Sequence, residues 1–230
     1  MFAPFPIVGK VLRPYGEVRP PFNAKITLPF LAYLLVITPT AAISDQIRIL
    51  ALGDSLTAGY GLRQPDSFPS QLTRQLQNAD IKSEIINAGV SGDTTSGALQ
   101  RIDWLMDRRF DLAIVELGAN DALRGIDPAL TRQNLEKIVQ KLKATGTPIL
   151  LTGMKAPRNL GPDYAKRFDD VFPAIAHHQG LDFYPFFLEG VAADPKLNQQ
   201  DGLHPNAKGV AIIAERILPF VINALRKDFK

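Results

Sequence analysis

Ser55 is the first residue of this chain whose type and position suggest chemistry. It follows an apolar run of strand length, within the sequence GDSLT. A hydroxyl is a weak nucleophile unless a base lies beside it. Taken alone, a serine at this place is better explained as the N-cap of the next helix. Ser55 therefore predicts catalysis only if the rest of the chain supplies a base.

The chain has only three histidines from which that base could come. His177 and His178 lie at the predicted end of a helix, where the helix dipole favours a cation and solvent is near. His204 lies in the loop sequence DGLHPN, three residues after Asp201. This spacing lets the carboxylate fold back onto the imidazole and hold one tautomer, although a turn with an exposed histidine has the same pattern. We expect Ser55, His204 and Asp201 to act together.

Two further polar segments could stabilise negative charge that develops during acyl transfer. The segment NAGVSGD (87–93) contains Gly89, which can offer a bare backbone N–H, and the segment GAND (118–121) contains the Asn120 side-chain amide. A tetrahedral intermediate needs two or three such donors. Ordinary turns also use glycine and asparagine, so each segment is a weak signal by itself. Their occurrence in order, at successive predicted strand ends, is more specific.

Five apolar runs of strand length define the framework that must position these residues. Segments with helical periodicity separate the runs, which predicts an α/β fold: a five-stranded parallel sheet in a three-layer α/β/α sandwich. Ligands of such sheets bind beyond the carboxyl ends of the strands, where the polar segments lie. The expected strands are Ile47–Leu52, Glu84–Val90, Asp111–Leu117, Pro148–Thr152 and Leu181–Phe187.

The helical segments have apolar faces and recognisable ends. Asp127-Pro128 is a typical helix start, and Thr145-Gly146 and Gln179-Gly180 are typical stops. The apolar faces repeat with helical period over three stretches; they run from Leu135 to Leu142, from Tyr164 to Ile175, and from Val210 to Leu225.

The first 45 residues differ in composition from the rest. They contain seven of the 18 prolines, and then Lys25, an apolar run from Ile26 to Ile37 and a small-residue end. This order is typical of a secretory signal peptide, and the run is shorter than the about 20 residues of a membrane-spanning helix. We expect a leader at 1–45 that is cleaved near Ala42, a domain at 46–230, a periplasmic or secreted protein without a stable membrane anchor, and a cytoplasmic one if the leader is kept.

Charge and composition exclude several classes of function. Four cations and one anion precede Ile43, which leaves 22 of the 26 cations and 22 of the 23 anions in the remainder. The domain is thus electrically balanced, and we expect no nucleic-acid partner. The chain has no cysteine, and its three histidines lack metal-ligand spacing, so we expect no metal site.

The four segments together resemble the SGNH (GDSL) hydrolase family, whose name records Ser, Gly, Asn and His. The blocks are GDSLTAGYGL, NAGVSGDTT, ELGAND and DGLHPN, and the resemblance covers about 46–225. Within the family, the chain is most similar to the bacterial acyl-CoA thioesterase I, lysophospholipase and arylesterase subgroup. The resemblance implies an α/β/α fold without a cofactor. It implies that Ser55 is the nucleophile, His204 the base and Asp201 its partner, and that the Ser55 N–H, the Gly89 N–H and the Asn120 side chain form the oxyanion hole.

We therefore expect a serine esterase or thioesterase that forms an acyl-enzyme on Ser55. Its partner would be a small-molecule acyl ester or thioester, and the protein would be a monomer or weak dimer. Two alternatives remain: a carbohydrate O-acetyl esterase, and a non-catalytic binding domain on the same fold. Apolar loops after the third and fourth strands favour an acyl chain; the pocket residues that we expect there are Leu123, Ile126, Met154, Pro157 and Leu160.

Overall fold

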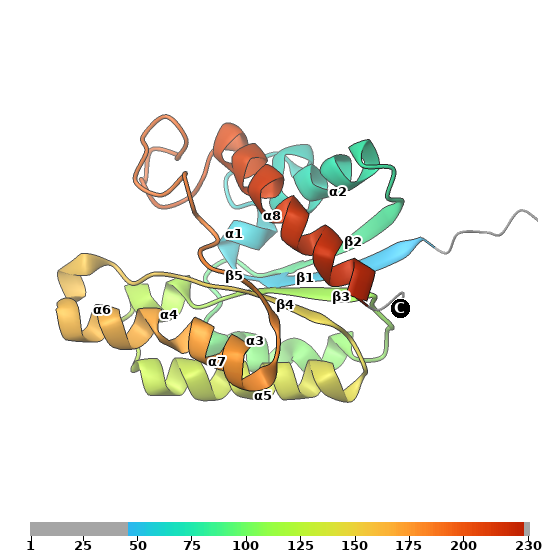
Figure 1. The fold of residues 1–230 in the computed structure, drawn as a ribbon. Helices are drawn as coiled ribbons and strands as arrows, with labels where there is room; N and C mark the ends of the chain where they lie inside the picture. The colour runs from blue at the N-terminus through green and yellow to red at the C-terminus, as the bar shows by residue number, and fades with distance from the viewer. Residues whose placement is uncertain (1–45, 228–230) are drawn as a thin grey trace, which may run out of the picture. The chain divides into compact units, whose positions relative to one another are not determined.

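The computed structural model describes residues 46–227, and the predicted leader lies outside them. One five-stranded sheet in the order β2-β1-β3-β4-β5 forms the centre, and every neighbouring pair is parallel. Figure 1 shows this sheet with helices on both sides. The predicted α/β/α fold is confirmed. The strands are β1 (Ile47–Gly53), β2 (Ser83–Gly89), β3 (Leu112–Glu116), β4 (Ile149–Thr152) and β5 (Asp182–Tyr184).

The strands lie where continuous apolar sequence predicts them. β3 and β4 are buried at every position, as expected for strands covered by helices on both faces. The last strand is shorter than predicted, because it ends at Tyr184 rather than Phe187. Pro185 follows and has no N–H to continue a ladder. The chain still returns to the sheet edge through a bond from the Phe187 N–H to the Gly153 carbonyl.

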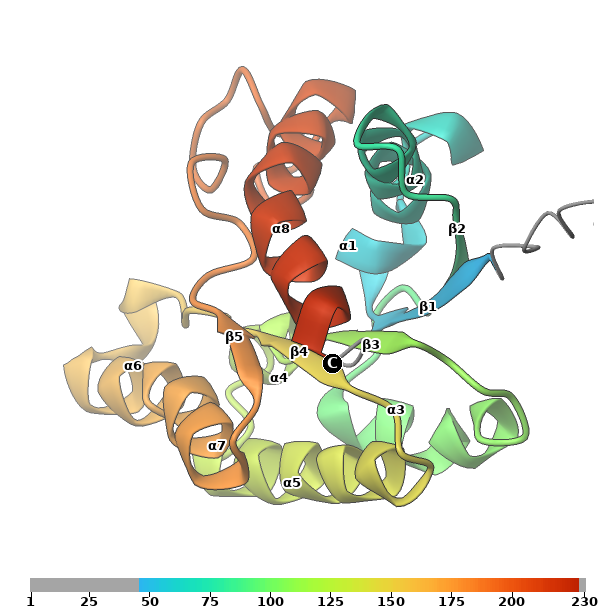
Figure 2. The same ribbon diagram turned by 45° about the vertical axis from the view of Figure 1, so that its right-hand side comes forward.

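Two helical layers cover the sheet (Figure 2). One layer contains α1 (Ser55–Ala58), α2 (Phe68–Asn78) and α8 (Ala207–Lys227). The other contains α3 (Thr95–Arg101), α5 (Pro128–Ala144) and α7 (Val171–Gln179), with α4 (Ala119–Leu123) and α6 (Pro162–Asp169) towards one end. Three 3₁₀ turns complete the described chain: η1 (Gln64–Asp66), η2 (Ile102–Leu105) and η3 (Arg158–Leu160). Within residues 46–227, no helix is both long enough and apolar enough to cross a membrane.

The predicted helix ends agree with the structure, with one difference. The Asp127 side chain caps α5 by accepting from the Ala129 N–H, and Gly146 and Gly180 adopt left-handed backbone after α5 and α7. The apolar face from Tyr164 to Ile175 belongs to two helices, α6 and α7, rather than one. Pro173 explains the interruption, because it cannot donate to the carbonyl four residues earlier.

Strand register brings the polar segments together. Gly53 at the end of β1 lies opposite Gly89 of β2 and opposite Glu116 of β3. After β1 the chain enters the layer of α1 and α2, whereas after β3 it enters the layer of α5. The segments that follow these two neighbouring strands therefore leave the sheet on opposite faces, and such a switch point is where open α/β sheets bind ligands.

Candidate active site

A tight turn after β1 presents the Ser55 hydroxyl. A Cβ added to Gly53 would lie 2.0 Å from Thr57 Oγ1 and 2.6 Å from Glu116 Oε2, so only glycine fits there. Asp54, not Ser55, is the N-cap of α1, since its Oδ1 accepts a 2.9 Å bond from the Leu56 N–H. The Ser55 hydroxyl is thus not used as a helix cap.

Ser55, His204 and Asp201 form one continuous line of hydrogen bonds. Ser55 Oγ lies 2.9 Å from His204 Nε2, and His204 Nδ1 lies 2.7 Å from Asp201 Oδ2. The structure therefore brings together the three residues that the sequence predicted to act together. A serine, an imidazole and a carboxylate in this order can activate the hydroxyl and stabilise the imidazolium that forms.

Asp201 is held in its ionised form by the loop around it. Its Oδ1 accepts from the N–H groups of Leu203 and His204, at 2.9 and 3.0 Å. These bonds, the one from the His204 N–H first, and then the imidazole itself, lower the pKa of Asp201 to about 2. The carboxylate is consequently charged at any pH at which His204 could act as a base.

The turn rests on two buried carboxyl groups. Glu116 Oε2 accepts from the Thr57 hydroxyl at 2.8 Å and from the Asp54 N–H at 3.3 Å. Burial, and then the neighbouring Asp54 charge, raise the pKa of Glu116 well above its ordinary value. Burial also raises the pKa of Asp54 to about 6, although hydrogen bonds from Leu56 and Asn120 oppose that shift. Of these two carboxyl groups, Glu116 is thus the one whose protonated form burial favours more strongly.

Asn120 lies in α4, directly after the third strand. Its Nδ2 donates to Asp54 Oδ2 at 3.1 Å, and because an amide nitrogen carries two hydrogens, one remains for another acceptor. Asp121 fixes the helix, since its buried carboxylate accepts from the Thr95 N–H and from the Thr95 and Thr131 hydroxyls. Asn120 is thereby held at the switch point beside the Ser55 turn.

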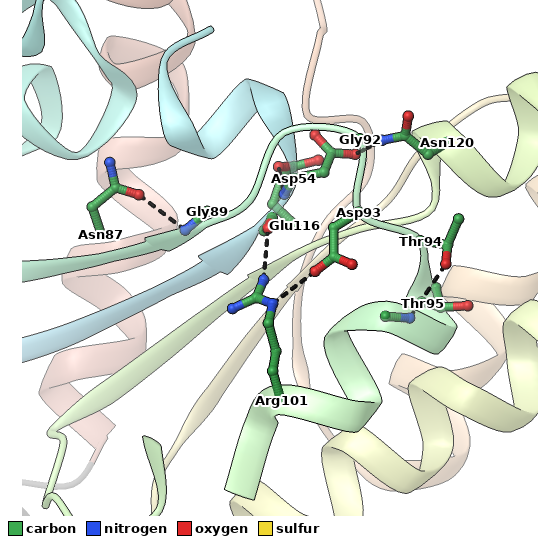
Figure 3. Close-up of polar contacts among 12 residues, drawn as sticks. Asp54, Asn87, Gly89, Gly92, Asp93, Thr94, Thr95, Arg101, Glu116 and Asn120 are labelled. Atoms are coloured by element: carbon green, nitrogen blue, oxygen red, sulfur yellow. Dashed lines mark hydrogen bonds and ion pairs between the residues drawn. The ribbon is translucent and has the colours of Figure 1, made fainter. Parts of the chain in front are cut away.

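Gly89 does not offer the bare N–H that the sequence suggested. Its N–H donates to Asn87 Oδ1 at 3.0 Å, and a Cβ there would lie 2.3 Å from the Ala58 nitrogen. Gly89 therefore supports close packing of β2 against α1. In Figure 3 it lies beside Asn87, whereas Gly92 lies in the loop near Asp54 and Asn120.

Gly92 is the residue of this segment that sequence reasoning missed. It has left-handed backbone (φ +80°), and among the described residues its N–H has no hydrogen-bond acceptor. Arg124 fixes the loop by donating to the Gly92 carbonyl at 2.8 Å. The neighbouring Asp93 binds Arg101 (Figure 3), and Arg101 also donates to the Gly53 carbonyl at 3.1 Å. These bonds attach the Gly92 loop to the turn that carries Ser55.

A pocket of about 160 Å³ adjoins the triad, and Ser55, Asn120 and His204 all line it. Of the predicted pocket residues, the structure places Leu123, Met154 and Pro157 in its wall, but not Ile126 and Leu160. Ile126 lies beyond α4, where its carbonyl accepts from the Tyr164 hydroxyl. Leu160 ends the η3 turn.

Other residues line the same pocket without having been predicted to do so: Leu56, Ala119, Lys155, Leu188 and Leu203. Leu203 is 52% exposed and Leu123 is 50% exposed. Large apolar side chains that stay in water around a polar centre indicate a surface that binds an apolar group. In the sequence, Leu203 lies in DGLHPN (201–206) and Leu188 lies in YPFFLEGV (184–191). These two segments were the only sequence signal for a role of either leucine in the pocket. Within residues 46–227, no three His, Asp or Glu side chains are grouped to hold a metal ion.

Comparisons with known proteins show the family of this chain. The sequence profile of the GDSL-like lipase/acylhydrolase family matches residues 51–212. The chain belongs to this family. An arylesterase of Vibrio mimicus is 37% identical over 85% of the chain and 98% of the relative. The thioesterase 1/protease 1/lysophospholipase L1 of Escherichia coli K12 is 38% identical over 82% of the chain and 88% of the relative.

A solved structure agrees with these relatives. The crystal structure of AlinE4, an esterase of the SGNH-hydrolase family, is 48% identical, with a TM-score of 0.67 over 78% of this chain and 97% of that one. As a GDSL-like acylhydrolase with esterase and thioesterase relatives, the chain is a serine hydrolase of carboxylic esters and thioesters.

Proposed function

We propose that Ser55 is the nucleophile of this hydrolase, with His204 as its base and Asp201 orienting that base. The observation that carries the proposal is the line of contacts of 2.9 and 2.7 Å from Ser55 through His204 to Asp201. A non-catalytic binding domain on the same fold has no need for this arrangement, which activates a hydroxyl.

The reaction proceeds in two steps that use the same base. Ser55 Oγ attacks the substrate carbonyl carbon while His204 Nε2 takes the hydroxyl proton. The C–O or C–S bond then breaks, and the imidazolium returns the proton to the departing alcohol or thiol. Water next attacks the acyl-enzyme through His204, which releases the carboxylic acid and regenerates Ser55.

Three donors stabilise the oxyanion in this proposal. They are the Ser55 N–H, the free hydrogen of the Asn120 amide, and the Gly92 N–H in place of Gly89. The fixed Gly92 loop and the bond between Asn120 and Asp54 support this choice, because an oxyanion hole depends on donors that are held in place before the charge develops.

The substrates that we propose carry an acyl chain rather than an acetylated sugar. Apart from Lys155 and the polar side chains of Ser55, Asn120 and His204, the pocket is walled by leucine, methionine, proline and alanine, whereas a sugar site needs more polar groups and exposed aromatic rings. The solvent-exposed Trp104 lies in η2, which does not line this pocket. Aryl esters, acyl thioesters and lysophospholipids fit the names of the relatives.

A series of p-nitrophenyl esters from acetate to long acyl chains tests this function. The wild type should hydrolyse medium chains faster than acetate, and the Ser55→Ala variant should be inactive throughout. Leu123→Ser should lower the preference for longer chains, because it makes one wall of the pocket polar. Activity confined to acetate would favour the carbohydrate esterase, and no activity on any ester would favour the binding domain.

We also propose that residues 1–45 direct export and that cleavage follows Ala42. The charged flank, the apolar run and the small-residue end support this proposal. Expression of the full chain in a Gram-negative host, followed by cell fractionation and N-terminal sequencing, tests it. A periplasmic product that begins at Ile43 is expected, and a product with the apolar run intact in the cytoplasm would contradict it.

A further inference from the structure

His204 lies in a loop without regular structure, so specific bonds must hold it beside Ser55. We define the histidine loop as residues 196–206 and the nucleophile loop as residues 55–62. Within residues 46–227, only two hydrogen bonds join these loops: the contact between Ser55 and His204, and a bond from Gln199 Nε2 to the Tyr60 carbonyl at 2.8 Å. Among the described residues, Gln199 thus makes the one hydrogen bond between the loops outside the reacting pair.

Gln199 also holds the backbone around His204. Its Nε2 donates a second bond to the Pro205 carbonyl at 3.0 Å, so both amide hydrogens are used. Its backbone N–H donates to the His204 carbonyl at 2.7 Å. Three bonds from one residue therefore secure His204 on its own loop and across to the nucleophile loop.

The nucleophile loop is shaped to receive this side chain. Gly61 has left-handed backbone (φ +72°), and a Cβ there would lie 2.2 Å from Gln199 Oε1. Any other residue would push the glutamine away. The neighbouring Tyr60 ring lies 4.6 Å from the His204 imidazole, measured between centroids. This close approach gives a physical reason for the GYGL sequence that follows the serine.

We propose that Gln199, seated against Gly61, is a positioning residue that holds the His204 imidazole within proton-transfer distance of Ser55. The proposal rests on the roles of Ser55 and His204 proposed above. Gln199 lies outside the pocket lining and therefore does not bind the acyl group. Its removal should slow the chemical steps without weakening substrate binding.

The first experiment compares Gln199→Ala with a matched control, Gln71→Ala. Gln71 also donates across the fold, from α2 to the Ala207 carbonyl at 3.4 Å beside the histidine loop, but it makes no hydrogen bond to Tyr60 or His204 within the described residues. With p-nitrophenyl butyrate, Gln199→Ala should lower kcat about tenfold or more, because a displacement of about 1 Å can cost about 100-fold. KM should stay within about twofold, and the control should leave kcat unchanged.

A double-mutant cycle separates positioning from general loosening of the fold. Gly61→Ala should lower kcat in the wild type, since the new methyl group displaces the Gln199 amide. It should cost less in the Gln199→Ala background, where that clash is gone, so the two effects should not add. Gln199→Glu should be as slow as Gln199→Ala, because a carboxylate would face two carbonyl oxygens.

Several results would overturn the proposal. These are a kcat of Gln199→Ala within about twofold of the wild type, an equal loss in Gln71→Ala, a loss carried by KM alone, or additive effects in the cycle. Ser55→Ala is measured alongside to keep the two proposals apart. If Ser55→Ala is active, the proposed function fails; if it is inactive while Gln199→Ala is fully active, only the positioning role fails.

Discussion

Thr57 donates a 2.8 Å hydrogen bond to Glu116 Oε2 directly beneath the turn that carries Ser55. Glu116 is fully buried, and within the described chain its Oε1 has no hydrogen-bond partner. Ionisation of Glu116 would destabilise the folded protein, because the negative charge would be buried beside the Asp54 carboxylate and its Oε1 would have no hydrogen-bond donor. We infer that the folded protein holds Glu116 as a neutral acid that shapes the turn and takes no part in proton transfer.

Glu116→Gln tests this inference through stability. The folded-state pKa of Glu116 is raised, so the native protein keeps a proton that the unfolded chain releases above its ordinary value of about 4.5. The wild type thus loses stability as pH rises from that value through the raised pKa, and the glutamine variant does not. Urea unfolding between pH 4 and 8 should show the difference in unfolding free energy moving in favour of Glu116→Gln.

An exposed carboxylate provides the control for that measurement. Glu215 lies on the solvent side of α8, and Glu215→Gln should shift stability about equally at all pH values. A stability difference for Glu116→Gln that does not change with pH, or that changes in the opposite direction, would show that Glu116 is ionised in the folded protein.

Asp201→Asn should lower kcat by about 10²–10⁴-fold, because the amide no longer stabilises the imidazolium and can favour the wrong tautomer of His204. The folded protein lowers the pKa of Asp201 from 3.8 to about 2. The ionised carboxylate therefore stabilises the folded protein fully above pH 3.8, and this stabilisation is lost as pH falls towards 2. Protonation of Asp201 should therefore not set the acid limb of the pH–kcat profile. A loss of kcat in Asp201→Asn of less than about tenfold would contradict the role of Asp201.

The triad could be predicted from the sequence because its members follow from short-range features. Ser55 comes after a strand-length apolar run, and Asp201 and His204 are three residues apart in one loop. The choice between Gly89 and Gly92 could not be made in this way. It depends on the Asn87 side chain, which takes the Gly89 N–H, and on Arg124, which fixes the Gly92 carbonyl. Such contacts exist only once the loops are folded.

The oxyanion donors can be tested one at a time. Asn120→Ala should lower kcat by about 10²–10³-fold with little change in KM, since the amide acts mainly on the transition state. Asn87→Ala is the informative control, because it frees the Gly89 N–H without touching the proposed Gly92 donor. Its kcat should equal that of the wild type. A kcat of Asn120→Ala close to that of the wild type would contradict the role of Asn120, and a higher kcat in Asn87→Ala would indicate that the freed Gly89 N–H acts as a donor.

The pocket wall was predicted only in part, for a similar reason. Leu123 and Met154 follow the third and fourth strands closely, and strand ends are easy to place from sequence. Leu188 and Leu203 reach the same pocket from distant loops. The order of apolar residues within a loop does not reveal which one faces the pocket. The sequence therefore could not show that Leu123 lines the pocket whereas Ile126 and Leu160 do not.

Of the described lysines and arginines, Lys155 alone lines the pocket, and its ammonium lies 4.5 Å from the centre of the Phe186 ring. It should attract an anionic group carried by the substrate, such as the phosphates of an acyl-CoA. Lys155→Gln should raise KM for octanoyl-CoA severalfold and leave KM for octanoyl-N-acetylcysteamine, a neutral thioester, unchanged. Lys137→Gln, an exposed lysine on α5, controls for net charge. Equal changes for both thioesters would remove the proposed role.

The proposed mechanism requires that Ser55, activated by His204, attacks the substrate carbonyl. Incubation with a p-nitrophenyl alkylphosphonate, followed by peptide mass spectrometry, tests it most directly, because such esters trap the activated hydroxyl as a stable adduct. The proposed mechanism predicts one phosphonyl group per chain, on the peptide containing Ser55. It also predicts no adduct in Ser55→Ala and at least about 100-fold slower labelling in His204→Ala. An adduct on another residue, or undiminished labelling of Ser55→Ala, would contradict it.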